Sequence, residues 1–109
     1  MDRPAYENIT ASGLKARLDA GDRPVLLDVR EPWEFELARI EGSKLIPMGQ
    51  LAGRVSELDP ARETVVICHY GGRSAYVTLT LQRAGFAKVL NLEGGVDAYA
   101  NVDWSVPRY

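Results

Sequence analysis

The sequence predicts an α/β fold with three layers, in which helices cover both faces of a central, mostly parallel five-stranded sheet. Short runs of apolar, often β-branched residues lack the alternation with polar residues that half-exposed strands show, and such runs are typical of strands buried on both faces. They alternate along the chain with segments of helical periodicity, an order that gives a parallel sheet. The expected strands cover residues 5–9, 25–29, 44–46, 64–67 and 87–90.

The first helix is predicted from its two ends. Thr10 or Ser12 can cap it, because a side-chain oxygen there accepts a hydrogen bond from the first turn. Leu14 and Leu18 lie four residues apart and share one face of the helix, and Gly21 ends it. This helix is therefore expected between the first and second strands.

The second helix is short, since Pro32 fits its first turn and a strand follows soon after. We expect its aromatic residues, Trp33 and Phe35, to pack against the rest of the protein rather than to form a platform for a substrate. A third, amphipathic helix is predicted from apolar residues at intervals of three and four. These residues are Met48, Leu51, Val55 and Leu58.

The last two helices follow the two strands nearest the C-terminus. A helix over residues 74–84 is expected to bury a stripe made of Val77, Leu81 and Ala84. A shorter helix is expected after the glycine pair at 94–95. The resulting order of strands and helices completes the predicted three layers.

Composition limits the classes of function. The 109 residues are expected to form one domain, 1–109, and the net charge of −2 argues against binding nucleic acid. No apolar run approaches the roughly 20 residues of a membrane span, so no membrane partner is expected. One cysteine cannot form an internal disulfide, which is typical of a cytoplasmic protein, and with one histidine it gives no metal site. No cofactor is expected, because the glycine-rich motifs that bind nucleotides are missing.

The single cysteine, Cys68, directly follows the apolar run at 64–67. Ligands of parallel sheets bind outside the carboxyl ends of the strands, and loop amides and helix N-termini there attract anions. Gly71, Gly72 and Arg73 follow within five positions, and a cysteine that only fills space in a core needs none of them. We therefore expect Cys68 to be a nucleophile that the loop holds as a thiolate.

The stretch 68–74 resembles the active-site loop of the rhodanese sulfurtransferases, in which four residues separate a cysteine from an arginine. Further segments with the same resemblance cover most of the chain, and they are 26–32, 40–47, 85–86 and 89–99. The family usually has His at the position of Arg39, and often Ala at Ser43 and Trp at Tyr99. None of these differences lies in the loop.

The end of the chain carries a narrower resemblance. Residues 102–109 are similar to the end of the rhodanese domains that are fused to adenylyltransferases of the molybdopterin and thiamine type. Such domains have Pro at the position of Trp104. The resemblance implies that a protein could donate or accept the sulfur.

The family resemblance implies a sulfurtransferase. Cys68 would take the outer sulfur of thiosulfate or of a persulfide, and a nucleophilic acceptor would then remove it. Arg73 is expected to bind an anionic donor, and His69 and Tyr70 to form pocket walls and partner contacts. The expected substrate-binding residues are His69, Tyr70, Gly71, Gly72, Arg73 and Ser74. Asp28 and Arg30, at another strand end, are expected to shape the rim of the pocket or to support its structure.

Two other functions stay open at this point. Phosphatases and arsenate reductases of related folds place five residues between cysteine and arginine, whereas Cys68 and Arg73 enclose four, which leaves less room for a tetrahedral oxyanion. A rhodanese-fold binding, regulatory or sulfur-carrier module without significant thiosulfate turnover is the other alternative. Such modules often lack the cysteine that this chain has.

Overall fold

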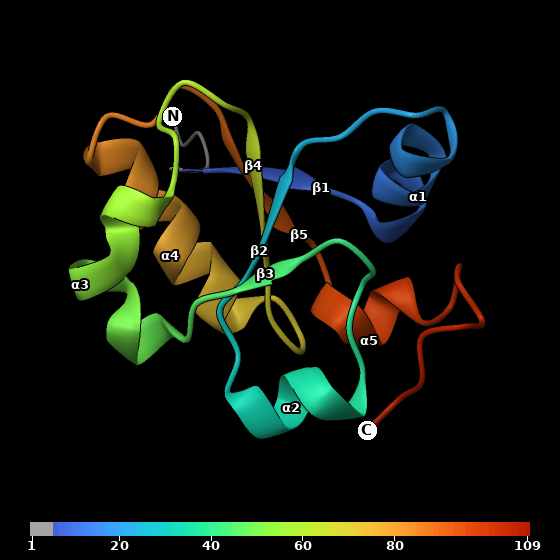
Figure 1. The fold of residues 1–109 in the computed structure, drawn as a ribbon. Helices are drawn as coiled ribbons and strands as arrows, with labels where there is room; N and C mark the ends of the chain where they lie inside the picture. The colour runs from blue at the N-terminus through green and yellow to red at the C-terminus, as the bar shows by residue number, and fades with distance from the viewer. Residues whose placement is uncertain (1–5) are drawn as a thin grey trace, which may run out of the picture.

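The computed structural model describes residues 6–109, and a five-stranded sheet forms its centre (Figure 1). The strand order is β1-β5-β4-β2-β3, and every neighbouring pair is parallel, which confirms the predicted fold class. The strands are β1 Glu7–Ile9, β2 Val25–Asp28, β3 Lys44–Leu45, β4 Thr64–Ile67 and β5 Val89–Leu92. The predicted first strand also included Ala5, which lies outside the described residues.

Helices lie on both faces of this sheet (Figure 1). They are α1 Ala11–Asp19, α2 Pro32–Leu37, α3 Leu51–Arg54, α4 Gly72–Arg83 and α5 Gly95–Tyr99. Residues of α1 and α5 share a hydrophobic cluster with one face, and residues of α3 and α4 share a second cluster with the other. Helix α2 lies beyond the carboxyl ends of the central strands, close to the C-terminus of the chain (Figure 1).

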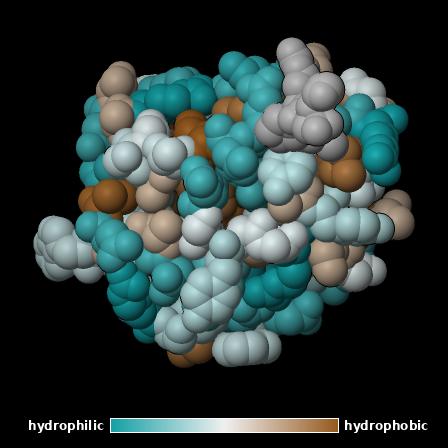
Figure 2. Space-filling view, turned by 180° about the vertical axis from the view of Figure 1, so that it is seen from behind, coloured by the Kyte–Doolittle hydropathy of each residue, from teal (hydrophilic) through white to brown (hydrophobic). Residues whose placement is uncertain are grey.

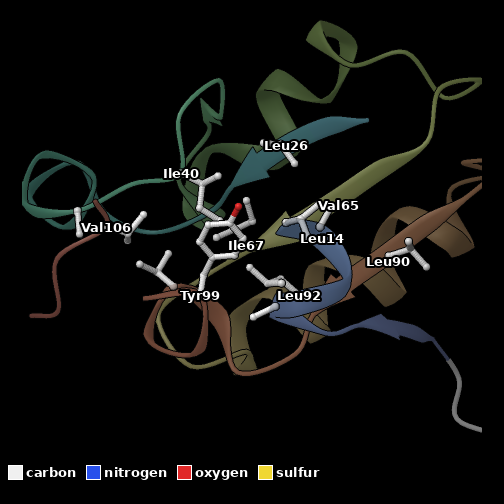
Figure 3. Close-up of a cluster of buried hydrophobic side chains, with 12 residues drawn as sticks. Leu14, Leu26, Ile40, Val65, Ile67, Leu90, Leu92, Tyr99 and Val106 are labelled. Atoms are coloured by element: carbon white, nitrogen blue, oxygen red, sulfur yellow. The ribbon is translucent and has the colours of Figure 1, made fainter. Parts of the chain in front are cut away.

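The central strand β4 is buried along its whole length. Because side chains of a strand alternate between faces, Val65 and Ile67 join the cluster under α1 and α5, which Figure 3 shows. Val66 and the following Cys68 join the cluster under α4. The strand therefore delivers the cysteine to the α4 side, at the end of the sheet where α2 lies.

The predicted amphipathic helix over 48–58 is wrong as a single element. Only Leu51–Arg54 is α-helical, and short 3₁₀ turns flank it at Met48–Gln50 and Val55–Glu57. Two glycines, Gly49 and Gly53, interrupt the segment, and each costs about 1 kcal/mol relative to alanine inside an α-helix. The apolar spacing still buries Leu51 and Leu58, so the segment covers the core without forming one helix.

Smaller predictions also differ from the structure. Ala84 is exposed, so the predicted stripe of α4 buries only Val77 and Leu81. Trp33 is 61% exposed, and it packs edge-on against the ring of Tyr109 at the surface. Helix α4 begins two residues earlier than predicted, because the glycine loop turns directly into it. Strand β5 continues past the predicted end at 90, since its polar residue Asn91 is buried and hydrogen-bonded to side chains on either side of it.

The face seen from behind is mostly hydrophilic, with small hydrophobic areas between polar side chains (Figure 2). Within residues 6–109, no helix has both the length and the apolar character to cross a membrane. The same residues include no group of three or more His, Cys, Asp or Glu side chains that could hold a metal ion.

Candidate active site

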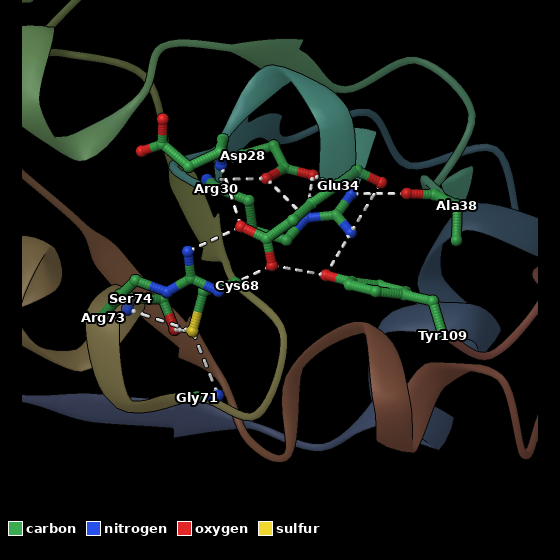
Figure 4. A network of polar contacts seen from close by, with 10 residues as sticks. Asp28, Arg30, Glu34, Ala38, Cys68, Gly71, Arg73, Ser74 and Tyr109 are labelled. Atoms are coloured by element: carbon green, nitrogen blue, oxygen red, sulfur yellow. Dashed lines mark hydrogen bonds and ion pairs between the residues drawn. The ribbon is translucent and has the colours of Figure 1, made fainter. Parts of the chain in front are cut away.

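The Cys68 sulfur lies inside a tight loop between β4 and α4, and the residue is 1% exposed. The Cys68 Sγ accepts hydrogen bonds from the backbone N–H groups of Gly71 (3.1 Å) and Ser74 (3.3 Å), shown in Figure 4. The Ser74 amide belongs to the first turn of the twelve-residue helix α4, where unpaired N–H groups favour negative charge. The loop thus offers its sulfur the surroundings that an anion requires.

Ser74 also brings a hydroxyl to the sulfur, since its Oγ lies 3.2 Å from the Cys68 Sγ. The same hydroxyl donates to Asn91 Oδ1 (2.5 Å), and Asn91 Nδ2 donates to Asn8 Oδ1 (3.0 Å). A neutral thiol can donate its S–H to the Ser74 oxygen. Ser74 can donate to a thiolate only if its hydroxyl hydrogen turns from Asn91 toward the sulfur. Sequence analysis missed Asn91, although one polar residue within the apolar run 89–92 was a signal.

Glycines let the loop approach its neighbours closely. Gly71 has φ +107°, a conformation that side chains disfavour, and it is the N-cap residue of α4. The first turn of α5 holds the back of the loop, because the N–H groups of Val96 and Asp97 donate to the carbonyls of Cys68 (2.9 Å) and His69 (3.0 Å). This contact leaves no space for a side chain at Gly95, where a Cβ would lie 2.4 Å from both carbonyl oxygens.

We expect Gly95→Ala to lower the reactivity of Cys68 toward an alkylating agent sharply, because the loop must shift to accept the added methyl group and Gly95 also has a positive φ of 61°. A loss of about 2 kcal/mol or more in the free energy of unfolding should accompany it. The matched control is Gly42→Ala, a glycine with φ +86° and open space around its Cβ position. Urea unfolding and alkylation of Cys68 in both variants check this, and equal effects would show that the close contact is unimportant.

Arg73, at the end of the loop, is held by a carboxylate from α2. Its Nη1 and Nη2 donate to Glu34 Oε1 (2.7 Å) and Oε2 (2.9 Å), so the two side chains form a bidentate ion pair. Glu34 is 4% exposed, and its Oε1 also accepts from the Glu31 N–H (3.0 Å). The Arg73 hydrogen bonds are the main cause that lowers the pKa of Glu34 to about 2, with smaller help from Glu31 and Tyr109. The carboxylate is therefore ionised at neutral pH, and it offsets the charge of Arg73.

Asp28 and Arg30 form a second ion pair that is fully buried. Arg30 Nε donates to Asp28 Oδ1 (2.9 Å), and Arg30 Nη2 donates to Asp28 Oδ2 (2.7 Å) and to the carbonyl of Ala38 (2.5 Å). Because neither side chain reaches the surface, the arrangement favours the expected structural support over a place on the pocket rim. The Ala38 contact ties the end of α2 to β2.

Tyr109 connects the two ion pairs (Figure 4). Its hydroxyl accepts from Arg30 Nη1 (2.7 Å) and donates to Glu34 Oε2 (2.8 Å). Burial is the main cause that raises the pKa of Tyr109 to about 12, so the hydroxyl keeps the proton that it donates. The network from Asp28 through Arg30, Tyr109 and Glu34 reaches Arg73 in the loop, and sequence analysis assigned no role in it to Tyr109 or Glu34.

The two residues after the cysteine stack on aromatic rings. The His69 ring lies 3.9 Å from the Tyr70 ring and 4.0 Å from the Tyr109 ring, with interplanar angles of 21° and 12°. Among the described residues, the buried Nε2 of His69 has no hydrogen-bond partner. Tyr70 is 66% exposed and Trp33 meets the Tyr109 ring edge-on, so aromatic side chains adjoin one another beside the loop. That His69 and Tyr70 contact a substrate or partner stays a prediction.

The fold and this site define an α/β protein whose single cysteine lies at the carboxyl end of the central strand, in a loop of converging amides. The family model of the rhodanese-like domain matches residues 10–102. The chain therefore belongs to the rhodanese-like domain family, as its motifs indicated.

Similar proteins support this assignment. A protein of Allochromatium vinosum called a sulfurtransferase is 34% identical over 92 residues, which cover 84% of this chain and 86% of that protein. The probable adenylyltransferase/sulfurtransferase MoeZ of Mycobacterium tuberculosis is 36% identical over 94 residues, or 84% of this chain and 24% of MoeZ. The crystal structure of a rhodanese-like domain protein from Staphylococcus aureus matches with a TM-score of 0.84 and 28% identity, covering 94% of this chain and 98% of that one.

Several of the curated relatives are longer than this chain, which spans 31%, 48% and 24% of the length of three of them. MoeZ carries an adenylyltransferase in its name, so the predicted similarity to rhodanese domains that are joined to adenylyltransferases is confirmed. The activities that these names state are those of the longer proteins.

Proposed function

We propose that this chain is a sulfurtransferase that moves a sulfane sulfur from thiosulfate or a persulfide to a nucleophilic acceptor through a persulfide on Cys68. One observation carries the proposal: the Cys68 sulfur accepts hydrogen bonds from the backbone N–H groups of Gly71 and Ser74, in the loop that leads into α4. These donors favour a thiolate as nucleophile and the anionic persulfide as intermediate. Relatives named as sulfurtransferases support the same class of reaction.

The proposed reaction has two steps. In the first, the Cys68 thiolate attacks the outer sulfur of the donor, a bond forms between Sγ and that sulfur, and the donor's S–S bond breaks. With thiosulfate, sulfite leaves with the bonding electron pair, and the three negative charges of the reactants are kept in the products. In the second step, an acceptor such as cyanide attacks the outer sulfur of the persulfide, and the Cys68 thiolate is restored.

The loop dimensions favour this reaction over phosphate-ester hydrolysis. Four residues lie between Cys68 and Arg73, and both Nη atoms of Arg73 are held by Glu34. A phosphoryl group needs amides and an arginine around three oxygens, whereas a persulfide adds one sulfur atom to Cys68. We therefore propose that the chain does not act as a phosphatase.

A sulfur carrier that is loaded once and unloaded by a protein partner is the second candidate. The observation that favours it is 38% identity over 88 residues to a putative sulfur carrier protein, YrkF of Bacillus subtilis. The same Cys68 persulfide would serve both functions. They differ in turnover: an enzyme releases its sulfur repeatedly to a small acceptor, whereas a carrier retains it until a partner binds.

Steady-state assays test the proposal. Thiocyanate formation from cyanide, with thiosulfate or a thiol persulfide as donor, should show many turnovers per protein molecule, and hydrolysis of para-nitrophenyl phosphate should stay at background. A single turnover with both donors would favour the carrier function. Hydrolysis of the phosphate ester that is lost after alkylation of Cys68 would overturn the proposal.

A further inference from the structure

The charges around the loop bear on which sulfur donor it accepts. Arg73 ends the loop that holds the Cys68 sulfur, and Figure 4 shows its guanidinium bound to the Glu34 carboxylate. The second arginine of the network, Arg30, is paired with Asp28 in the same way. Each pair has a net charge of zero. An incoming anion is therefore stabilised mainly by the backbone amides of the loop.

We propose that Glu34 determines donor specificity: by neutralising Arg73 it disfavours dianionic thiosulfate relative to thiol persulfides, R–S–S⁻, whose reacting group carries one negative charge fewer. This inference rests on the proposed sulfur transfer and names its donor class. The position of Glu34 is well defined, because the carboxylate is buried and has donors from Arg73, Glu31 and Tyr109. Its negative charge is thus a fixed part of the site.

The charge balance of the two loading reactions shows why this matters. With a persulfide, which is anionic at neutral pH, Cys68–S⁻ attacks the outer sulfur of R–S–S⁻, the S–S bond breaks, and R–S⁻ leaves with the electron pair, so the total charge stays at minus two. With thiosulfate the same attack brings a dianion to the thiolate, and the total is minus three. Because no cation of the network is left unneutralised, repulsion between like charges opposes the approach of thiosulfate more strongly than that of the persulfide.

The same reasoning changes the expected role of Arg73. The sequence predicted that Arg73 binds an anionic donor, but each of its Nη atoms already donates a hydrogen bond to Glu34. Removing the carboxylate charge should expose the attraction that Arg73 can exert. The variant Glu34→Gln does this with little change of shape, and one amide oxygen can still accept from Arg73.

The experiment compares two donors in three proteins. The donors are thiosulfate and N-acetylcysteamine persulfide, whose organic part is uncharged, and cyanide is the acceptor. In Glu34→Gln, we expect kcat/KM for thiosulfate to rise about tenfold through a lower KM, and that for the persulfide to change by less than about twofold. The control, Glu57→Gln, removes an exposed carboxylate that pairs with Arg54 and Lys44, and it should leave both donors unchanged.

The ratio of the two kcat/KM values is the deciding quantity, because partial unfolding of a variant lowers both values equally and cancels. A higher ratio of thiosulfate to persulfide in Glu34→Gln supports the proposal. An unchanged or lower ratio overturns it, and Glu34 then only holds the loop. Failure of the proposed function looks different, because neither donor would transfer sulfur in the wild-type protein.

Discussion

Replacing Cys68 by serine is expected to abolish sulfur transfer and to leave the fold intact. Cys68 is the only cysteine of the sequence, so no other residue can carry a persulfide. A serine oxygen can still accept from the Gly71 and Ser74 amides, but a hydroxyl is neither ionised nor sulfur-transferring at neutral pH. We expect activity to fall at least about a thousandfold and the free energy of unfolding to change by less than about 1 kcal/mol.

Thiocyanate formation and urea unfolding of the two proteins measure these effects. The control is Ser105→Ala, which removes an exposed hydroxyl far along the chain from the loop and should leave activity unchanged. Turnover by Cys68→Ser at the rate of the unmodified protein would rule out a covalent intermediate on this residue.

The second large effect is a loss of stability expected for Arg30→Met, because the charge of Asp28 then remains unpaired in the interior. Asp28 is fully buried, and Arg30 supplies its ion pair. Breaking a buried pair from one side costs about 3–5 kcal/mol, whereas an exposed pair contributes about 1 kcal/mol or less. Arg54→Met, which breaks an exposed pair with Glu57, is the matched control.

Urea unfolding of both variants gives the comparison. The double variant Asp28→Leu with Arg30→Met should recover part of the lost stability, because it removes the unpaired charge as well. Similar small losses for Arg30→Met and Arg54→Met would show that the buried network does not stabilise the fold.

Those parts of the fold that depend on neighbouring residues could be predicted from the sequence. The apolar run at 64–67, the cysteine after it and the glycines before a helix are consecutive, and each has a local physical reason. The parallel sheet followed from the alternation of strands and helices. The segment at 48–58 was mispredicted because apolar spacing was weighed without the helix-weakening effect of Gly49 and Gly53.

The polar network could not be predicted in this way, since its partners are distant in the sequence. Glu34 and Arg73 are 39 positions apart, and Tyr109 and Glu34 are 75 apart. The sequence has 15 acidic residues, and nothing in their local pattern indicates which one meets the loop arginine. Tertiary packing of α2 and of the chain terminus beside the loop decides it. The pairing changes the role that we propose for Arg73.

Intact-protein mass spectrometry after incubation with a sulfur donor tests the central claim most directly. The protein is treated with thiosulfate or N-acetylcysteamine persulfide, separated from the donor, and weighed before and after the addition of cyanide. The account predicts a gain of one sulfur atom on Cys68, loss of that atom to cyanide, and no gain in Cys68→Ser. A protein that gains no sulfur from either donor, or a serine variant that gains as much as the wild type, would contradict it.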